Sequence, residues 1–112
     1  MSRRHCLTLD LKNDPTSIAA YKEYHRKIWP EITESIKSGG ILDMEIYLLG
    51  TRLFMIMEVD EGFSFEKKVE SDRKNPKVQE WETLMWTFQQ ALPGALPDEK
   101  WLLMERIFKL EH

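Results

Sequence analysis

Alternation of apolar and polar side chains predicts four β-strands in this chain. The alternation has a period of two, which places the apolar side chains of each strand on one face. The expected strands cover residues 3–11, 41–48, 52–59 and 101–110. Gly50-Thr51, between the second and third strands, is short enough for a hairpin turn, so we expect these two strands to pair antiparallel.

Apolar residues three or four positions apart predict helices between these strands. The first helix follows Asp14 and Pro15, which supply an N-cap and a first helical residue. Pro30 lacks an amide hydrogen and restricts Trp29 before it, so we expect the helix to break there and to restart before Gly39 ends it. The other expected helices cover residues 63–71 and 76–92.

The order of these elements predicts a ferredoxin-like α+β fold, β-α-β-β-α-β, with an antiparallel sheet and no internal repeat or linker. Helices cover one face of such a sheet, while the other face still carries Leu, Met, Phe and Tyr side chains. An apolar face of that size is unusual on a monomer, so we expect a face-to-face homodimer. A functional site would then lie between the sheet and the helices, or inside the joined sheets.

Composition narrows the class of protein further. A chain of 112 residues and 13.3 kDa, with 42% hydrophobic and 31% charged residues, predicts one domain over 1–112. It contains no apolar run near the ~20 residues that cross a bilayer, and its alternating N-terminus is unlike a signal peptide, so we expect a cytoplasmic protein with no membrane partner. A net charge of -3 disfavours nucleic acid as a partner. The ending Leu110-Glu111-His112 is typical of the start of an affinity tag.

No metal-binding, phosphate-loop, dinucleotide or nucleophile-elbow motif is present, so we expect neither a metal nor a cofactor. The candidate chemistry lies instead at Tyr21 and His25, which are four residues apart and therefore share a helix face. Histidine is the side chain best suited to moving protons near neutral pH. The alternative is that His25 only forms a hydrogen bond near the break at Pro30.

Three further aromatic residues are candidate binding groups. Tyr47 shares the polar face of its strand with two acidic residues, where it can bind a hydroxyl-rich ligand or lie at a subunit interface. Trp81 and Trp86 lie on the last long helix and can be either core residues or an apolar wall. Such a wall suits a sugar, because the C–H groups of a sugar form an apolar patch while its hydroxyls need hydrogen-bonding partners.

The segment from Tyr21 to Glu31 has the spacing Tyr-x-x-x-His followed by Ile28-Trp29-Pro30-Glu31, and it closely resembles the L-rhamnose mutarotase family. Weaker matches follow in the family's order: Ile46-Tyr47-Leu48, and Trp81 ahead of Met85. The resemblance covers nearly the whole chain. It implies a homodimeric enzyme with the fold known as the dimeric α/β-barrel. Such an enzyme needs no cofactor and interconverts the α and β anomers of a 6-deoxy-L-hexose.

The resemblance also implies roles for individual residues. His25 would be the proton donor, and Tyr21, Tyr47 and Trp81 would contact the sugar. In relatives that act on L-rhamnose a second tryptophan can follow the first, whereas Glu82 follows Trp81 here. The sequence therefore leaves L-rhamnose and L-fucose open as substrates. The aromatic wall that a second tryptophan would form could come instead from Trp86 or from Lys100-Trp101. The second proton transfer could be performed by water or by a carboxylate, for which Glu31, Glu45 and Glu82 are the candidates.

Two other functions fit the same residues. A cofactor-free oxygenase or a haem-degrading protein could use this scaffold, because a fold alone does not determine function. A non-catalytic sugar-binding module could use the same aromatic and histidine side chains for recognition only.

Overall fold

The computed structural model describes residues 3–97 and 99–110, so Glu111 and His112 of the tag-like ending lie outside the described residues. Its elements are β1 (Arg3–Leu11), α1 (Pro15–Arg26), α2 (Pro30–Ser38), β2 (Ile41–Leu49), β3 (Arg52–Val59), α3 (Phe65–Arg73), α4 (Pro76–Trp86), β4 (Gln89–Gln90) and β5 (Leu102–Leu103). Within the described ranges, no helix has both the length and the apolar character that crossing a membrane requires.

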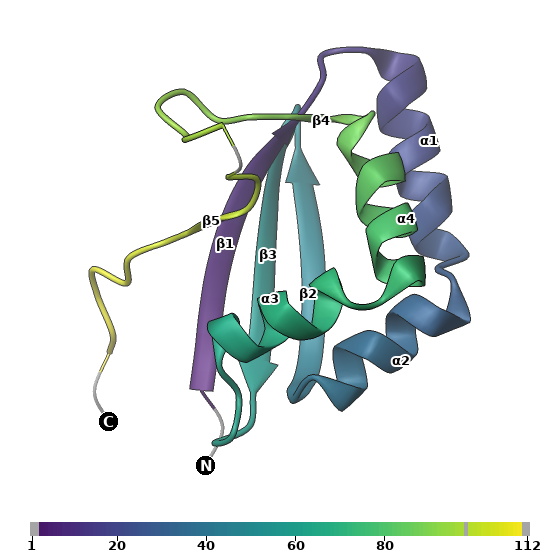
Figure 1. The fold of residues 1–112 in the computed structure, drawn as a ribbon. Coiled ribbons are helices and arrows are strands. Elements are labelled where there is room, and N and C mark those ends of the chain that lie inside the picture. The colour runs from purple at the N-terminus through teal and green to yellow at the C-terminus, as the bar shows by residue number, and fades with distance from the viewer. Residues whose placement is uncertain (1–2, 98, 111–112) are drawn as a thin grey trace.

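The strands form one antiparallel sheet in the order β2-β3-β1-β4, and β5 also pairs with β1. All four helices lie on one side of this sheet, so its other face is open (Figure 1). The register places Met55 of β3 between Leu7 of β1 and Ile46 of β2, on the face that packs against the helices. This arrangement confirms the predicted ferredoxin-like fold.

Local backbone chemistry explains where the helices begin. Asp14 caps α1 by accepting a hydrogen bond from the amide of Thr16, and Asn75 caps α4 in the same way. The predicted break is confirmed, because Trp29 is extended and α2 begins at Pro30. The short third helix begins at Phe65 rather than 63, because Ser64 is its N-cap.

The first residues of β2 differ from the expected alternation. A β-bulge between Ile41 and Asp43 shifts the pairing with β3 by one residue. Ile41 is therefore buried in the core, whereas Leu42, which a regular alternation over 41–48 would place on the apolar face with Met44, Ile46 and Leu48, is exposed. From Met44 onward the alternation follows the prediction, with the even-numbered side chains toward the helices.

The last long helix is shorter than the apolar spacing predicted. It ends at Trp86 rather than near residue 92, because the following residues bond to β1 instead of continuing the helix. The carbonyl of Phe88 accepts a hydrogen bond from the amide of Lys12, and Gln89 pairs with Leu11. This turn from helix to strand brings the side chain of Gln89 into the interior.

The last strand is also shorter than expected. Pairing with β1 covers only Leu102 and Leu103, followed by one hydrogen bond from the amide of Met104 to the carbonyl of Cys6. Residues 104–110, here called the C-terminal arm, then run away from the sheet edge (Figure 1). The arm is rich in apolar residues but has no neighbouring strand in the described chain, so these side chains are exposed.

Candidate active site

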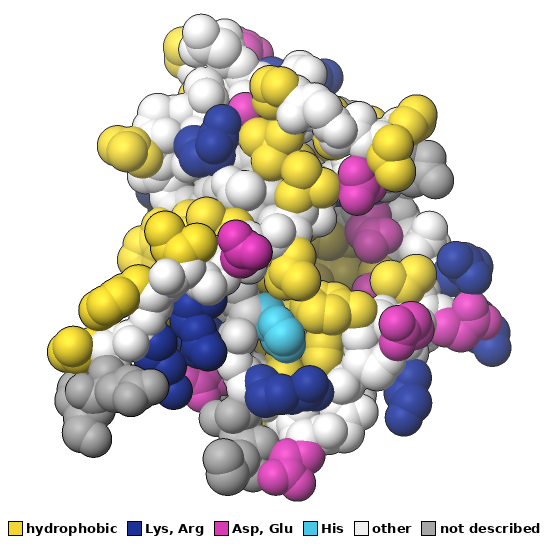
Figure 2. Space-filling view, turned by 90° about the vertical axis from the view of Figure 1, so that its left-hand side faces the viewer, with side chains coloured by type: hydrophobic (Ala, Val, Ile, Leu, Met, Phe, Trp, Pro, Cys, Tyr) yellow, Lys and Arg dark blue, Asp and Glu magenta, His cyan; other side chains and the backbone are white. Residues whose placement is uncertain are grey.

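A cavity of about 230 Å³ lies between the sheet and the helices. Most of its wall is apolar, and it includes side chains from β2, β3 and all four helices. Drug-sized ligands usually occupy pockets of about 300–1,000 Å³, so this cavity suits a smaller ligand. On the side of the molecule drawn in Figure 2, the surface is hollowed, with hydrophobic side chains in the floor of the hollow and acidic side chains at its margin.

Tyr21 and His25 lie on the same face of α1, and both line the cavity. Their ring centroids are 4.4 Å apart. Nδ1 of His25 lies 2.8 Å from the carbonyl oxygen of Tyr21. Because a carbonyl oxygen can only accept a hydrogen bond, Nδ1 carries the proton, and the lone pair of the neutral ring is on Nε2.

The surroundings of His25 favour its neutral form. Burial lowers the pKa of the imidazole below its ordinary value of 6.5, and the hydrogen bond to Tyr21 only partly opposes this effect. A neutral imidazole with a free Nε2 lone pair can accept a proton from a ligand hydroxyl at neutral pH. His25 is therefore poised as a proton acceptor before it can act as a donor.

The phenol of Tyr21 is fixed by a residue that the sequence did not indicate. Tyr21 is buried, and its hydroxyl accepts a hydrogen bond from Nε2 of Gln89 at 3.3 Å. Burial raises the pKa of Tyr21, so the phenol stays protonated and can donate to a ligand oxygen. Gln89 reaches this site only because α4 ends early, and no local sequence pattern signals that ending.

Trp81 of α4 forms an aromatic wall beside His25. Its ring centroid lies 5.6 Å from that of His25 and 5.1 Å from that of Trp29, both in edge-on geometry. Tyr24 packs edge-on against the same indole. Trp81 is only 8% exposed, so it is part of the core and of the cavity wall at once.

Glu82, the residue at the position of the expected second tryptophan, lines the same cavity. Burial raises the pKa of its carboxyl, and the nearby Asp72 carboxylate raises it further, while Lys100 and Lys68 act in the opposite direction. Oε2 of Glu82 also accepts a hydrogen bond from Gln79. The wall at this point is therefore polar rather than aromatic.

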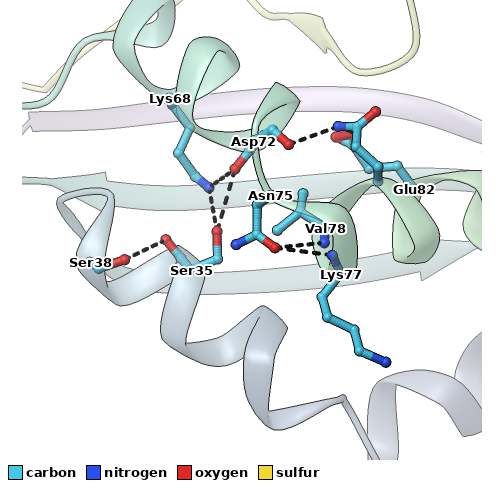
Figure 3. Close-up of polar contacts among 9 residues, drawn as sticks. Ser35, Ser38, Lys68, Asp72, Asn75, Lys77, Val78 and Glu82 are labelled. Atoms are coloured by element: carbon cyan, nitrogen blue, oxygen red, sulfur yellow. Dashed lines mark hydrogen bonds and ion pairs between the residues drawn. The ribbon is translucent and has the colours of Figure 1, made fainter.

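A group of polar side chains at the cavity wall was not predicted from the sequence. Nζ of Lys68 donates to Oδ1 of Asp72 at 2.5 Å and to Oγ of Ser35 at 3.2 Å (Figure 3). All three residues line the cavity. Oγ of Ser35 in turn donates to Asp72 at 3.4 Å. We call these residues the Ser35–Lys68–Asp72 cluster. Its only sequence signal is an (i, i+4) ion pair on α3, a spacing that is common on solvent-facing helices.

Two of the remaining candidates, Tyr47 and Trp86, do not line this cavity. Tyr47 is 54% exposed on β2 and lines an adjacent groove together with Tyr21 and His25. The Glu45 carboxylate beside it raises the pKa of Tyr47. Trp86 is half-buried on α4 with Nζ of Lys100 5.3 Å from its ring, and Trp101 rather than Trp86 lines the cavity. Within residues 3–97 and 99–110, no three His, Cys, Asp or Glu side chains are placed to hold a metal ion.

The fold and this cavity define a ferredoxin-like α+β protein with a histidine, a tyrosine and a tryptophan around a small-ligand site. A family model described as L-rhamnose mutarotase matches residues 4–110, and the chain belongs to this family of carbohydrate isomerases. The resemblance found in the sequence is therefore confirmed.

Individual relatives agree with the family. The chain is 44% identical over 110 residues to the L-fucose mutarotase of Xanthomonas campestris pv. campestris, covering 96% of this chain and 88% of that protein. It is 29% identical over 99 residues to the L-rhamnose mutarotase of Acidiphilium cryptum, covering 87% and 89%. The structure of L-rhamnose mutarotase from Formosa agariphila superposes with a TM-score of 0.72 at 23% identity, covering 97% and 99%.

Proposed function

We propose that this protein interconverts the α and β anomers of a 6-deoxy-L-hexose, and that it acts on L-fucose in preference to L-rhamnose. The observation that carries the proposal is the neutral His25 imidazole beside Trp81 in a cavity of monosaccharide size. The preference for L-fucose is supported by the higher identity to the L-fucose relative. Glu82 after Trp81 supports it too, because it replaces an aromatic wall with a group that binds hydroxyls.

His25 can carry the proton transfer of this reaction by itself. Ring opening of a hemiacetal moves one proton from the anomeric hydroxyl to the ring oxygen as the bond between C1 and that oxygen breaks. Nε2 of neutral His25 accepts the proton from the anomeric hydroxyl, and the resulting imidazolium donates it to the ring oxygen. Rotation about the bond between C1 and C2, followed by the reverse steps, gives the other anomer.

Aromatic and polar groups around His25 hold the sugar for this transfer. The indole of Trp81 offers an apolar face to the C–H groups of the ring, and the protonated phenol of Tyr21 can donate to a sugar oxygen. Tyr47 remains a proposed sugar contact, by way of the groove that it shares with Tyr21 and His25. Glu82 is a further proposed sugar contact, whose carboxylate accepts a hydrogen bond from a sugar hydroxyl. We assign the additional aromatic wall to Trp101, because Trp101 lines the cavity and Trp86 does not.

Saturation-transfer proton NMR on equilibrated L-fucose and L-rhamnose tests the proposed function. One anomeric proton is irradiated, and the signal of the other anomer is followed with and without protein. We expect protein-dependent transfer that is faster with L-fucose. Binding of either sugar without any transfer would instead identify a non-catalytic sugar-binding module.

The proton-accepting role of His25 predicts a pH dependence. Because the pKa of His25 is lowered, the ring stays neutral at pH 7 and gains its charge only below its ordinary value of 6.5. The protein-dependent exchange rate should therefore be constant near neutral pH and fall as the pH decreases through a pKa below 6.5. The rate is measured from about pH 5 to 8, and the rate without protein is subtracted. A rate that rises toward acid pH would show that His25 enters the reaction as imidazolium.

We further propose that the protein is a homodimer joined through the open face of its sheet. Phe54 and Ile56 of β3 lie on this face, which no helix of the described residues covers (Figure 1). The C-terminal arm adds further apolar side chains, with Ile107 89% and Phe108 75% exposed. Hydrophobic side chains along the left-hand margin of Figure 2 mark this part of the surface. A second copy would cover this apolar surface.

Substitution in the arm tests the dimer. Wild-type protein should have twice the 13.3 kDa chain mass in light scattering. Phe108→Asp should shift the mass toward that of one chain, because a carboxylate would be buried in the interface. Leu96→Asp, in a loop, introduces the same charge at another exposed apolar position and should leave the dimer intact. A wild-type protein with the mass of one chain would contradict the proposal.

A further inference from the structure

The Ser35–Lys68–Asp72 cluster is an unusual feature in the wall of a mainly apolar cavity. The side chains of Lys68 and Asp72 are only 14% and 18% exposed. An ion pair shielded from water adds little net stability, since desolvation offsets most of the attraction between the charges. Polar groups placed in an apolar pocket usually orient a ligand and give specificity. The cluster is therefore a candidate for recognition of the ligand.

The ammonium of Lys68 is held in place before any ligand binds. The stem of Lys68 lies against Gly39, where a Cβ atom would come within 2.8 Å of its Cδ. Ser35 and Asp72 accept two of its hydrogen bonds, and an ammonium has three protons. One donor of Lys68 is thus available, next to an Asp72 carboxylate that can accept. A fixed donor beside an acceptor binds a hydroxyl at little cost in conformational entropy.

The cluster and His25 lie toward opposite ends of the cavity. Lys68 rests on Gly39, just before β2 begins at Ile41. His25 instead shares a groove with Leu48, near the end of β2. In a pyranose ring C4 lies across from C1. A sugar with its anomeric carbon at His25 would therefore direct its 4-hydroxyl toward the cluster.

We propose that the Ser35–Lys68–Asp72 cluster binds the 4-hydroxyl of the substrate and determines selectivity for the configuration at C4. Lys68 donates a hydrogen bond to this hydroxyl and Asp72 accepts one from it, while Ser35 positions both side chains. The proposal rests on the proposed function, because it needs an anomeric carbon at His25. L-fucose has an axial 4-hydroxyl. The preference for L-fucose would then arise at residues that contact the sugar far from its reacting atoms.

Comparison of two C4 epimers tests this assignment. L-fucose and 6-deoxy-L-glucose differ only at C4, and anomer exchange of both is measured by saturation-transfer NMR. We expect wild-type protein to exchange L-fucose faster. Lys68→Met and Asp72→Asn should each slow exchange of L-fucose by about tenfold to a hundredfold, the value of one hydrogen bond to a charged group. Exchange of 6-deoxy-L-glucose should change much less, so that the ratio between the two sugars falls toward one.

The matched control is the exposed ion pair between Glu70 and Lys74, which has the same (i, i+4) spacing at 3.2 Å but faces solvent. Glu70→Gln and Lys74→Met should leave both rates unchanged. If Lys68→Met does not fold, the ratio of the two exchange rates is measured with Asp72→Asn, which keeps the shape of the side chain.

Two results would overturn the inference but not the proposed function. The first is an equal loss of exchange rate with both epimers in the variants, which is expected if the cluster only holds α2 against α3. The second is an active wild-type protein that exchanges the two epimers at the same rate. A wild-type protein that exchanges neither L-fucose nor L-rhamnose would overturn the proposed function, and the inference with it.

Discussion

Replacing His25 with alanine should lower protein-dependent anomer exchange by about 10²–10⁴-fold, the usual contribution of a positioned acid or base. The substitution removes the only imidazole that lines the cavity among the described residues. The fold should be kept, because the one hydrogen bond of His25 is to the backbone of its own helix. Exchange rates are measured by saturation-transfer NMR, and folding by circular dichroism.

His5→Ala is the matched control for this prediction. His5 packs edge-on against Phe65 and near Phe63, outside the cavity that holds His25. Loss of this imidazole should leave exchange close to the wild-type rate. Full activity of the His25 variant would remove His25 from the proton transfer and make Glu82, one of the carboxylates in the same cavity, the next candidate.

Sequence patterns predicted the parts of this fold that depend on neighbouring residues. Alternation identified β1 and the hairpin of β2 and β3, since alternate side chains of each strand are buried or half-buried on the face toward the helices. The break between α1 and α2 follows from Pro30 alone. The (i, i+4) spacing of Tyr21 and His25 likewise predicted that their side chains share a helix face, and both line the cavity.

The parts that the sequence did not predict depend on distant residues. Ile41 and Leu42 are both apolar, so only pairing with β3 decides which of them is buried at the bulge. The end of α4 depends on hydrogen bonds from β1, which direct Gln89 toward Tyr21. The same limit applies to the Ser35–Lys68–Asp72 cluster, whose members come from two helices.

The C-terminal arm shows a different limit. Its apolar positions led us to expect a strand over 101–110, but residues 104–110 are not part of a strand, because a strand needs a neighbour with which to pair. Pairing with β1 ends at Leu103, so the arm itself has no neighbouring strand in the described chain. The pattern therefore fits a surface that is completed by a second copy, in agreement with the proposed dimer.

Replacing Trp81 with alanine is expected to have the largest effect on stability. Truncation of a large aromatic side chain in a core costs about 3–5 kcal/mol, because the cavity left behind is only partly filled. Trp81 belongs to a core cluster with Leu9 and Leu53, and the rings of Tyr24, His25 and Trp29 pack against it. A loss of this size is a large part of the 5–15 kcal/mol that is typical of a folded domain.

Urea unfolding followed by fluorescence measures this effect, with Trp86→Ala as the matched control. Trp86 lies on the same helix but is half-buried under Lys100, so its loss should cost only about 1 kcal/mol. Trp81→Phe keeps an aromatic face and should recover much of the stability while still weakening sugar binding, because the smaller ring covers less of the sugar. Equal costs for the two alanine variants would mean that the indole of Trp81 does not hold α4 against the sheet. The aromatic wall beside His25 would then be neither a core element nor a rigid platform for the sugar.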